Sequence, residues 1–465
     1  MSRRSEGTSP PRAGRRPHGD TDREILRLAV PAFLALVAEP LFLLTDAAIV
    51  GHLGTAELAG LGIAATVLQT VVGLCVFLAY GTTASVARHL GAGDLRAGLA
   101  LGVDGIWLAL GLGVVLTALG VVLTEPLVAA FGVSAEIGGH AETFLRIAFL
   151  GTAPLLVMLA ATGVLRGLQD TRTPLVVAIA GNALNVVANL VLVYGVGSFA
   201  GLGLAGSAWG SLLAQTASAT ALCVVVVRGA RRHEARLRPS ALGVRRAGRA
   251  GVPLLVRTLT LRAALLVTVV AVTLGAGDGD AGADRIATHQ VAMTLWTFLA
   301  FVLDAVAIAA QALTGRALGA GDVEGTRRLT RRMVSWGLWS GVALGLLLAL
   351  ASPLLGRLFT DDPDVPGLLV PVLLVAALGQ PVAGVVFVLD GVLIGAGDGR
   401  YLAWAGLVVA VVYAPITLAA VAWGGGLVVV WVLFAGLFMT GRLVTLLHRA
   451  RGDAWLRTGA GTVAP

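Results

Sequence analysis

Long apolar runs alternate with short polar connections along almost the whole chain. Each run has about 20 residues or more, the length that an α-helix needs to cross the hydrocarbon core of a bilayer. A helix satisfies its own backbone hydrogen bonds in lipid, whereas a transmembrane barrel would show alternating segments of about ten residues. The pattern therefore predicts an all-α integral membrane protein with twelve spans, near residues 25–50, 61–86, 97–123, 141–162, 173–195, 202–228, 250–274, 287–311, 332–356, 367–394, 401–423 and 427–447.

The composition supports this interpretation. Hydrophobic residues make up 57% of the 465 residues, only 13% are charged, and the mean hydropathy is +0.88. A soluble protein has about 25% charged residues. The apolar excess must therefore face the lipid bilayer, which we expect to be a partner of the chain.

The net charge of +8 reflects membrane topology and gives no indication of nucleic-acid binding. Arginines gather in alternate connections, whereas the opposite connections carry mainly acids, such as Glu57, Glu136 and Asp280. Cytoplasmic loops of membrane proteins carry an excess of basic residues. We therefore expect a multi-pass protein of the plasma (inner) membrane with both termini in the cytoplasm and no nucleic-acid partner.

The chain repeats itself at an offset of 228 residues. "RHLGAGD" at 88–94 returns as "RALGAGD" at 316–322, and "GVLRGLQD" at 163–170 returns as "GVLIGAGD" at 391–398. Because six helices per half is an even number, the two bundles have the same orientation, as in transporters that hold substrate between two halves. The predicted boundaries are a disordered cytoplasmic tail (1–22), an N-terminal six-helix lobe (23–228), an Arg-rich cytoplasmic linker (229–249), a C-terminal six-helix lobe (250–449) and a cytoplasmic tail (450–465).

The ordered set of motifs resembles the multidrug and toxic compound extrusion (MATE) family. The pieces that carry the resemblance are "VPAF…PLFLLTDAAIVGHLGTAELAG", "RHLGAGD", "GNALNVVANLVLVYG" and "GLGLAGSAWGS". The second half is similar to the branch related to DNA-damage-inducible protein F, through "VRTLTLRAALL", "HQVAMTLWTFLAFVLDAVAIAAQ" and "LDGVLIGAGDG". The resemblance implies a V-shaped pair of six-helix bundles that exports small organic compounds, cationic or amphiphilic, by antiport with a cation and without a cofactor. No partner subunit is needed to complete such a cavity, so we expect a monomer.

Asp46 is an acid inside the first apolar run. An aspartate at a helix centre costs roughly 2.5–3.5 kcal/mol on insertion scales, so such residues are usually functional. Glu39 lies two helical turns earlier on the same face. The resemblance implies a cation-binding carboxylate at Asp46; the alternative is an acid that merely ends the helix near the outer surface.

Three asparagines in the fifth run are spaced so that they share one helix face: Asn182, Asn185 and Asn189. They either pack helices together through amide hydrogen bonds or share a cation pocket with Asp46. In the family the position of Asn189 is commonly Asp. With one acid instead of two, a sodium site loses an anionic oxygen, which favours H+ as the coupling ion and leaves Na+ as the alternative.

The second half contains four charges within its apolar runs, Arg257, Arg262, Asp304 and Asp390. Intramembrane charges of opposite sign usually pair. The four therefore predict either a structural salt-bridge cluster or a part of the substrate site. Gln69 and Gln290 are candidates for lining the cavity.

Two other functions are weaker alternatives. The "GAGD" strings lack the lysine of a phosphate-binding loop, and the chain has no H-E-x-x-H or Cys/His metal spacing. These features argue against an enzyme or a metal site, and the strings instead predict Gly turns with Asp capping the next helix. A flippase for lipid-linked intermediates shares the two-lobed plan but would need a strongly cationic cavity. The sequence therefore favours a proton-coupled exporter.

Overall fold

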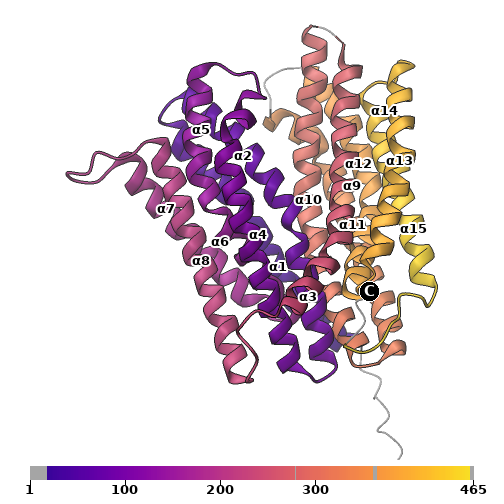
Figure 1. The fold of residues 1–465 in the computed structure, drawn as a ribbon. Coiled ribbons are helices and arrows are strands. Elements are labelled where there is room, and N and C mark those ends of the chain that lie inside the picture. The colour runs from indigo at the N-terminus through magenta and orange to yellow at the C-terminus, as the bar shows by residue number, and fades with distance from the viewer. Residues whose placement is uncertain (1–17, 278, 360–363, 461–465) are drawn as a thin grey trace, which may run out of the picture.

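The computed structural model describes residues 18–277, 279–359 and 364–460, and these fold into helices that form two lobes (Figure 1). The N lobe contains the first eight helices and the C lobe the rest. The N lobe comprises α1 (His18–Gly51), α2 (Thr55–Cys75), α3 (Phe77–Gly91), α4 (Leu95–Ala129), α5 (Ala135–Leu150), α6 (Thr152–Gly167), α7 (Arg172–Tyr194) and α8 (Leu204–Arg232). The C lobe comprises α9 (Ala241–Ala276), α10 (Asp280–Gly319), α11 (Val323–Phe359), α12 (Asp364–Gly395), α13 (Gly399–Ala422), α14 (Leu427–Val432), the π-helical turn η1 (Leu433–Phe438) and α15 (Met439–Arg451).

The predicted number of membrane spans is confirmed. Within the described residues, 11 helical spans are long and apolar enough to cross a membrane. The helices α5 and α6 together form a twelfth span, bent by 47° at Gly151. The helices α2 and α3 form one span, as do α14, η1 and α15. The apolar runs dictate this outcome because each is long enough to span lipid as a helix.

The repeated "GAGD" strings form matching turns in the two lobes. Gly93 and Gly321 have φ of +76° and +77°, which glycine adopts without the steric cost of a Cβ atom. The aspartate that follows each glycine caps the next helix, since Asp94 accepts from the Ala97 amide at 2.9 Å and Asp322 from the Gly325 amide at 2.7 Å. The predicted role of these strings is therefore confirmed at both positions.

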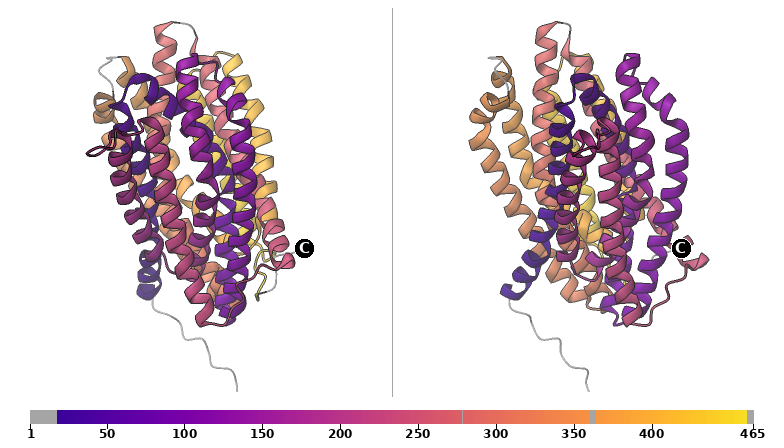
Figure 2. Two further views of the ribbon diagram at one scale, coloured as in Figure 1. Left: turned by 60° about the vertical axis from the view of Figure 1, so that its left-hand side comes forward. Right: turned by 90° about the vertical axis from the view of Figure 1, so that its left-hand side faces the viewer.

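The lobes touch at one end of the molecule and diverge toward the other (Figures 1 and 2). We call the end where they touch the Arg-rich end; it carries the connections around residues 92–94, 168–171, 233–240, 320–322 and 396–398. A Cβ atom on Gly91 would lie 1.9 Å from the Arg316 carbonyl oxygen, and one on Gly319 would lie 2.0 Å from that of Arg88. Glycines at these two positions therefore allow the backbones of α3 and α10 to meet.

The element boundaries differ from the predicted ones at three places. Helix α1 begins at His18, inside the predicted tail 1–22, of which residues 1–17 lie outside the described residues. The linker between helices is only 233–240, because α8 and α9 extend into the predicted 229–249 segment. The acids Asp278, Asp361 and Asp362, assigned from sequence to the less basic connections, also lie outside the described residues.

The C-terminal segment 452–460 folds back onto the Arg-rich end and joins the two lobes. The Trp455 side chain is buried in the core of the C lobe. The guanidinium of Arg88, on α3 of the N lobe, donates to the carbonyl of Ala396 at 2.6 Å, to that of Gly459 at 3.2 Å and to that of Arg457. Arg88 therefore ties the predicted tail to both lobes; residues 461–465 lie outside the described residues.

We expect Arg88→Gln to destabilise the fold. A glutamine side chain is too short to donate to all three carbonyls, and each buried acceptor left without a donor costs about 1–3 kcal/mol. Thermal unfolding of the purified protein in detergent should show a lower midpoint than for Arg96→Gln, which removes an exposed arginine from the neighbouring helix α4. Equal midpoints for the two variants would contradict this role of Arg88.

Candidate coupling-ion and substrate site

A cavity of about 450 Å³ occupies the N lobe and reaches the C lobe at its inner end. Most of its lining is apolar, and nearly all of it comes from helices α1 to α8. Among the described lining residues, Asp304 on α10 is the one that the C lobe contributes. Four charged side chains line the cavity, the acids Glu39, Asp46 and Asp304 and the base Arg166. Three acids against one arginine give the cavity an excess of negative charge.

Asp46 lies in a buried polar network formed by three helices. Its carboxylate accepts from the Asn189 amide at 2.5 Å and from the Ser211 hydroxyl at 3.2 Å. The amide of Asn185 donates to Ser211 at 3.1 Å, and its oxygen accepts from Asn189 at 3.3 Å. Asp46 is 4% exposed, and both asparagines are fully buried. The network therefore holds a single carboxylate away from bulk water, surrounded by donors.

The spacing of residues along α7 explains why this network forms. Asn185 and Asn189 are one turn apart, so both side chains face α1. Gly210 on α8 allows the close approach, because a Cβ atom there would lie 1.9 Å from the Asn189 side-chain oxygen. The Tyr194 hydroxyl donates to the Ile49 carbonyl at 2.6 Å and ties the ends of α7 and α1 together.

Two further predicted residues lie near the network without joining it. Asn182 donates to the Ala38 carbonyl at 2.8 Å and lines the cavity. Glu39 also lines the cavity, and among the described residues it makes no hydrogen bond or ion pair with the Asp46 network. The structure thus brings Asn185 and Asn189 to Asp46, whereas Asn182 and Glu39 face the cavity deeper in the lobe.

The matching place in the C lobe contains no carboxylate. Thr268 is the repeat equivalent of Asp46, and its hydroxyl lies 2.8 Å from the hydroxyl of Tyr413. Tyr413 occupies the repeat position of Asn185, at the offset of 228. Both C-lobe residues are fully buried. The duplication therefore kept a polar contact in both lobes but an acid only in the N lobe.

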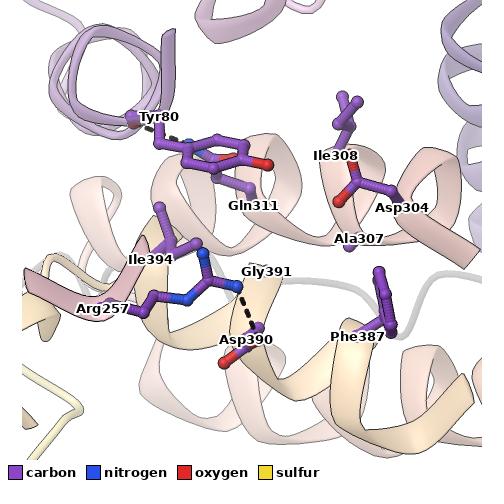
Figure 3. A pocket seen from close by; sticks show the side chains of 10 residues that line it. All are labelled: Tyr80, Arg257, Asp304, Ala307, Ile308, Gln311, Phe387, Asp390, Gly391 and Ile394. Carbon is purple, nitrogen blue, oxygen red and sulfur yellow. Dashed lines mark hydrogen bonds and ion pairs between the residues drawn. The ribbon is translucent and has the colours of Figure 1, made fainter. Parts of the chain in front are cut away.

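The predicted charge cluster of the C lobe has a different membership. Asp390 on α12 pairs with Arg257 on α9 at 2.7 Å, as predicted, and also with Arg442 on α15 (Figure 3 shows the Arg257 pair). Arg262 was predicted to take part, but it is exposed and lies against Gly73 of α2. Asp304 was also predicted to take part, yet among the described residues it makes no ion pair within 4 Å. Arg442 replaces Arg262 because Arg257 and Arg262 are five positions apart and lie on different faces of one helix.

The two glutamines predicted to line the cavity have different outcomes. Gln69 lines it. Gln290 is exposed and is not among the lining residues. The prediction for Gln290 is therefore wrong, because its position on α10 turns it away from the N lobe.

Several residues of the site were not predicted from the sequence. Ser211 and Tyr80 are ordinary polar residues in apolar runs, and only their contacts identify them. Arg166 was grouped with the basic connections because it lies in the last turn of α6, yet its side chain reaches the cavity. Asp104 is an acid within an apolar run, a signal that identified Asp46. It is fully buried on α4 and anchors the linker by accepting from Arg236 at 2.7 Å and from the Ser240 amide at 2.9 Å.

Comparison with known proteins places this fold and site among efflux transporters. A family model described as MatE matches residues 31–191 and 261–419, one stretch in each lobe. Protein DETOXIFICATION 44, chloroplastic, from Arabidopsis thaliana is 31% identical, over 92% of this chain and 81% of that protein. DNA damage-inducible protein F from Escherichia coli is 31% identical, over 65% of each chain.

The solved structures show the same fold. A multidrug resistance MATE family transporter in an outward-facing conformation aligns with a TM-score of 0.83 at 22% sequence identity, covering 94% of this chain and 97% of that one. The two-bundle, twelve-helix arrangement is therefore shared along nearly the whole chain. The family indicates a transporter rather than an enzyme, with small-molecule substrates and a bilayer as its partners. The chain belongs to the MATE family of multidrug and toxin efflux transporters.

Proposed function

We propose that this transporter exports organic cations or cationic amphiphiles and couples their export to the entry of H+ at Asp46. The observation that carries the proposal is the single buried carboxylate of the Asp46 network, held by amide and hydroxyl donors beside an acidic cavity. The cavity has three lining acids and one arginine. Positive substrates are attracted to such a surface, and water is excluded from most of it by apolar side chains.

Proton coupling follows from the chemistry of a buried acid. Burial away from water disfavours the charged form of a carboxylate, so a proton is a favourable ligand for Asp46. The protonated acid is a weaker acceptor, so protonation weakens the bonds from Asn189 and Ser211. These bonds join α1 to α7 and α8, and a change in them biases the lobe between conformations.

Na+ is the second candidate, and one observation favours it. The side-chain oxygen of Asn189 is buried and, within the described part of the chain, has no hydrogen-bond partner. An amide oxygen without a partner is available to a hard cation, which takes oxygen ligands. The opposing argument is that Asn189 presents its NH2 group, a donor, to Asp46.

One experiment separates the two ions. Purified protein in proteoliposomes is supplied with a fluorescent organic cation and with either a proton gradient or a sodium gradient, each in the absence of the other. Our proposal expects transport with the proton gradient alone. Transport that needs sodium would refute proton coupling.

The flippase alternative has weaker support. Binding a pyrophosphate headgroup requires several cationic groups, whereas the described lining of the cavity contains one arginine and three acids. A translocation assay with a lipid-linked sugar intermediate tests this alternative directly. Translocation of that lipid without transport of organic cations would favour it.

We further propose that the protein is a monomer of the plasma (inner) membrane, with the Arg-rich end and both termini in the cytoplasm. The excess of arginines at that end supports this orientation. The cavity then opens outward, because the lobes touch at the Arg-rich end and diverge toward the other (Figure 1).

Cysteine labelling in intact cells should show this orientation. A variant without the two free cysteines, Cys75 and Cys223, carries a new cysteine either at exposed Asp280, in the first turn of α10, or at exposed His233, in the linker. A membrane-impermeant maleimide should modify position 280 and spare position 233 until the cells are permeabilised. The reverse pattern would invert the proposed topology.

A further inference from the structure

Asp304 is an acid in the middle of α10 that the charge cluster of the C lobe leaves unpaired. Its carboxylate lies apart from the Arg257–Asp390 pair and on the same side as the hydroxyl of Tyr80 (Figure 3). It is partly exposed, and among the described residues it accepts no hydrogen bond and makes no ion pair within 4 Å. It also lines both the large cavity and a small one beside Tyr80 and Arg257. An intramembrane acid in this condition is available to a ligand in the cavity.

Arg166 faces the same space from the opposite lobe. It lies in the last turn of α6, lines the large cavity and interacts electrostatically with Asp304. Within the described part of the chain, Arg166 also makes no ion pair within 4 Å. Opposite charges in a membrane interior usually pair. Here the two charges attract each other across the lobe boundary but do not touch, which leaves room for a charged group between them.

The neighbouring arginines are already engaged. Arg257 binds Asp390 and lies 5.9 Å from the centre of the Tyr80 ring. Arg442 binds the same aspartate. Arg166 is therefore the cation that is available to Asp304 from the cavity side.

We propose that Asp304 binds the cationic group of the transported molecule, and that Arg166 takes the place of that group when the transporter returns empty. The proposal rests on the proposed export of organic cations. Asp304 lies near the middle of its helix and at the inner end of the outward cavity, below which the lobes close at Gly91 and Gly319. A site at this depth is exposed to one side or the other as the lobes rock. Asp46, near the end of α1, is separate from it.

The exchange of one cation for another explains why an arginine lies in an otherwise acidic cavity. An acid that loses its ligand inside a membrane is left uncompensated, which is strongly unfavourable. Movement of Arg166 toward Asp304 compensates this charge after substrate release and allows the empty lobes to close. A bound substrate cation makes the same compensation during export. Arg166 therefore serves the return step and competes with substrate during binding.

Binding and transport of radiolabelled tetraphenylphosphonium, a permanent organic cation, test the two roles separately. Binding is measured on purified protein in detergent without any ion gradient. Transport is measured in proteoliposomes in two ways, as net export driven by a proton gradient and as exchange of labelled for unlabelled probe, which bypasses the empty return. The variants are Asp304→Asn, Asp304→Glu and Arg166→Gln. The control is Arg262→Gln, which removes an exposed arginine outside the cavity lining.

We expect Asp304→Asn to weaken probe binding at least about tenfold and Asp304→Glu to retain most of it. Arg166→Gln should bind the probe as tightly as the parent or more tightly, keep its exchange rate and lose most of its net export. The control should match the parent in all three measurements. Since a structural role of Arg166 would lower exchange and net export together, the split between them identifies the return step.

Three outcomes would overturn the inference. If Asp304→Asn binds the probe within about twofold of the parent, Asp304 is not the binding acid. If Arg166→Gln loses exchange as fully as net export, Arg166 does not act in the return step. If Asp304→Asn does not fold, weak binding by folded Asp304→Glu combined with full net export by Arg166→Gln would also reject it. A parent protein that neither binds nor moves the probe would instead refute the proposed export of organic cations.

Discussion

Asp46→Asn should abolish export driven by a proton gradient while leaving the protein folded. Asparagine mimics the protonated acid and cannot release a proton. It preserves the buried contacts, because its oxygen can still accept from Asn189 and its amide can donate to Ser211. A membrane potential supplies about 2.3 kcal/mol per charge per 100 mV, and without a titrating group this energy no longer drives the lobes.

The measurement is efflux of a fluorescent organic cation from proteoliposomes with an imposed proton gradient and no sodium. The expected rate for Asp46→Asn is that of the parent protein without a gradient. Glu39→Gln is the matched control, since it neutralises an acid on the same helix that faces the cavity outside the Asp46 network. Export by Asp46→Asn at the parental rate would show that the proton binds elsewhere.

Asp390→Asn should lower the stability of the C lobe more than neutralisation of either Asp304 or Asp280 does. It leaves Arg257 and Arg442 facing each other without their shared carboxylate. All three side chains are largely buried, with at most 13% of each exposed. Removing one partner from a buried ion pair costs about 3–5 kcal/mol. The yield of monodisperse protein and the midpoint of its thermal unfolding should both fall.

The second substitution in this test is Arg442→Met in the Asp390→Asn background. It removes the extra positive charge and fills its space with an apolar chain, so part of the lost stability should return. Asp280→Asn, at an exposed position of α10, is the control and should resemble the parent. Full yield of Asp390→Asn would show that these three charges do not stabilise the lobe as a cluster.

The features that follow from local sequence were predictable. The twelve spans are set by runs of apolar residues, because each helix satisfies its own backbone in lipid whatever surrounds it. The matching turns of the two lobes depend on Gly93 and Gly321 and on the caps that follow, all within a few residues. The common face of Asn185 and Asn189 follows from helical periodicity.

The features that depend on how helices meet were not predictable from these patterns. Asp46 is bound by residues 143 and 165 positions later in the chain, and of these only the asparagine had a spacing that marked it. Arg442 was assigned to a basic connection, yet a long side chain can extend along its helix to reach a buried acid. The chain's own charge count allowed Arg257 and Arg262 to balance Asp304 and Asp390. The packing of α9 against α12 and α15 chose Arg257 and Arg442 for Asp390, and left Asp304 facing the cavity, because the direction of a side chain is fixed only when its helix has neighbours.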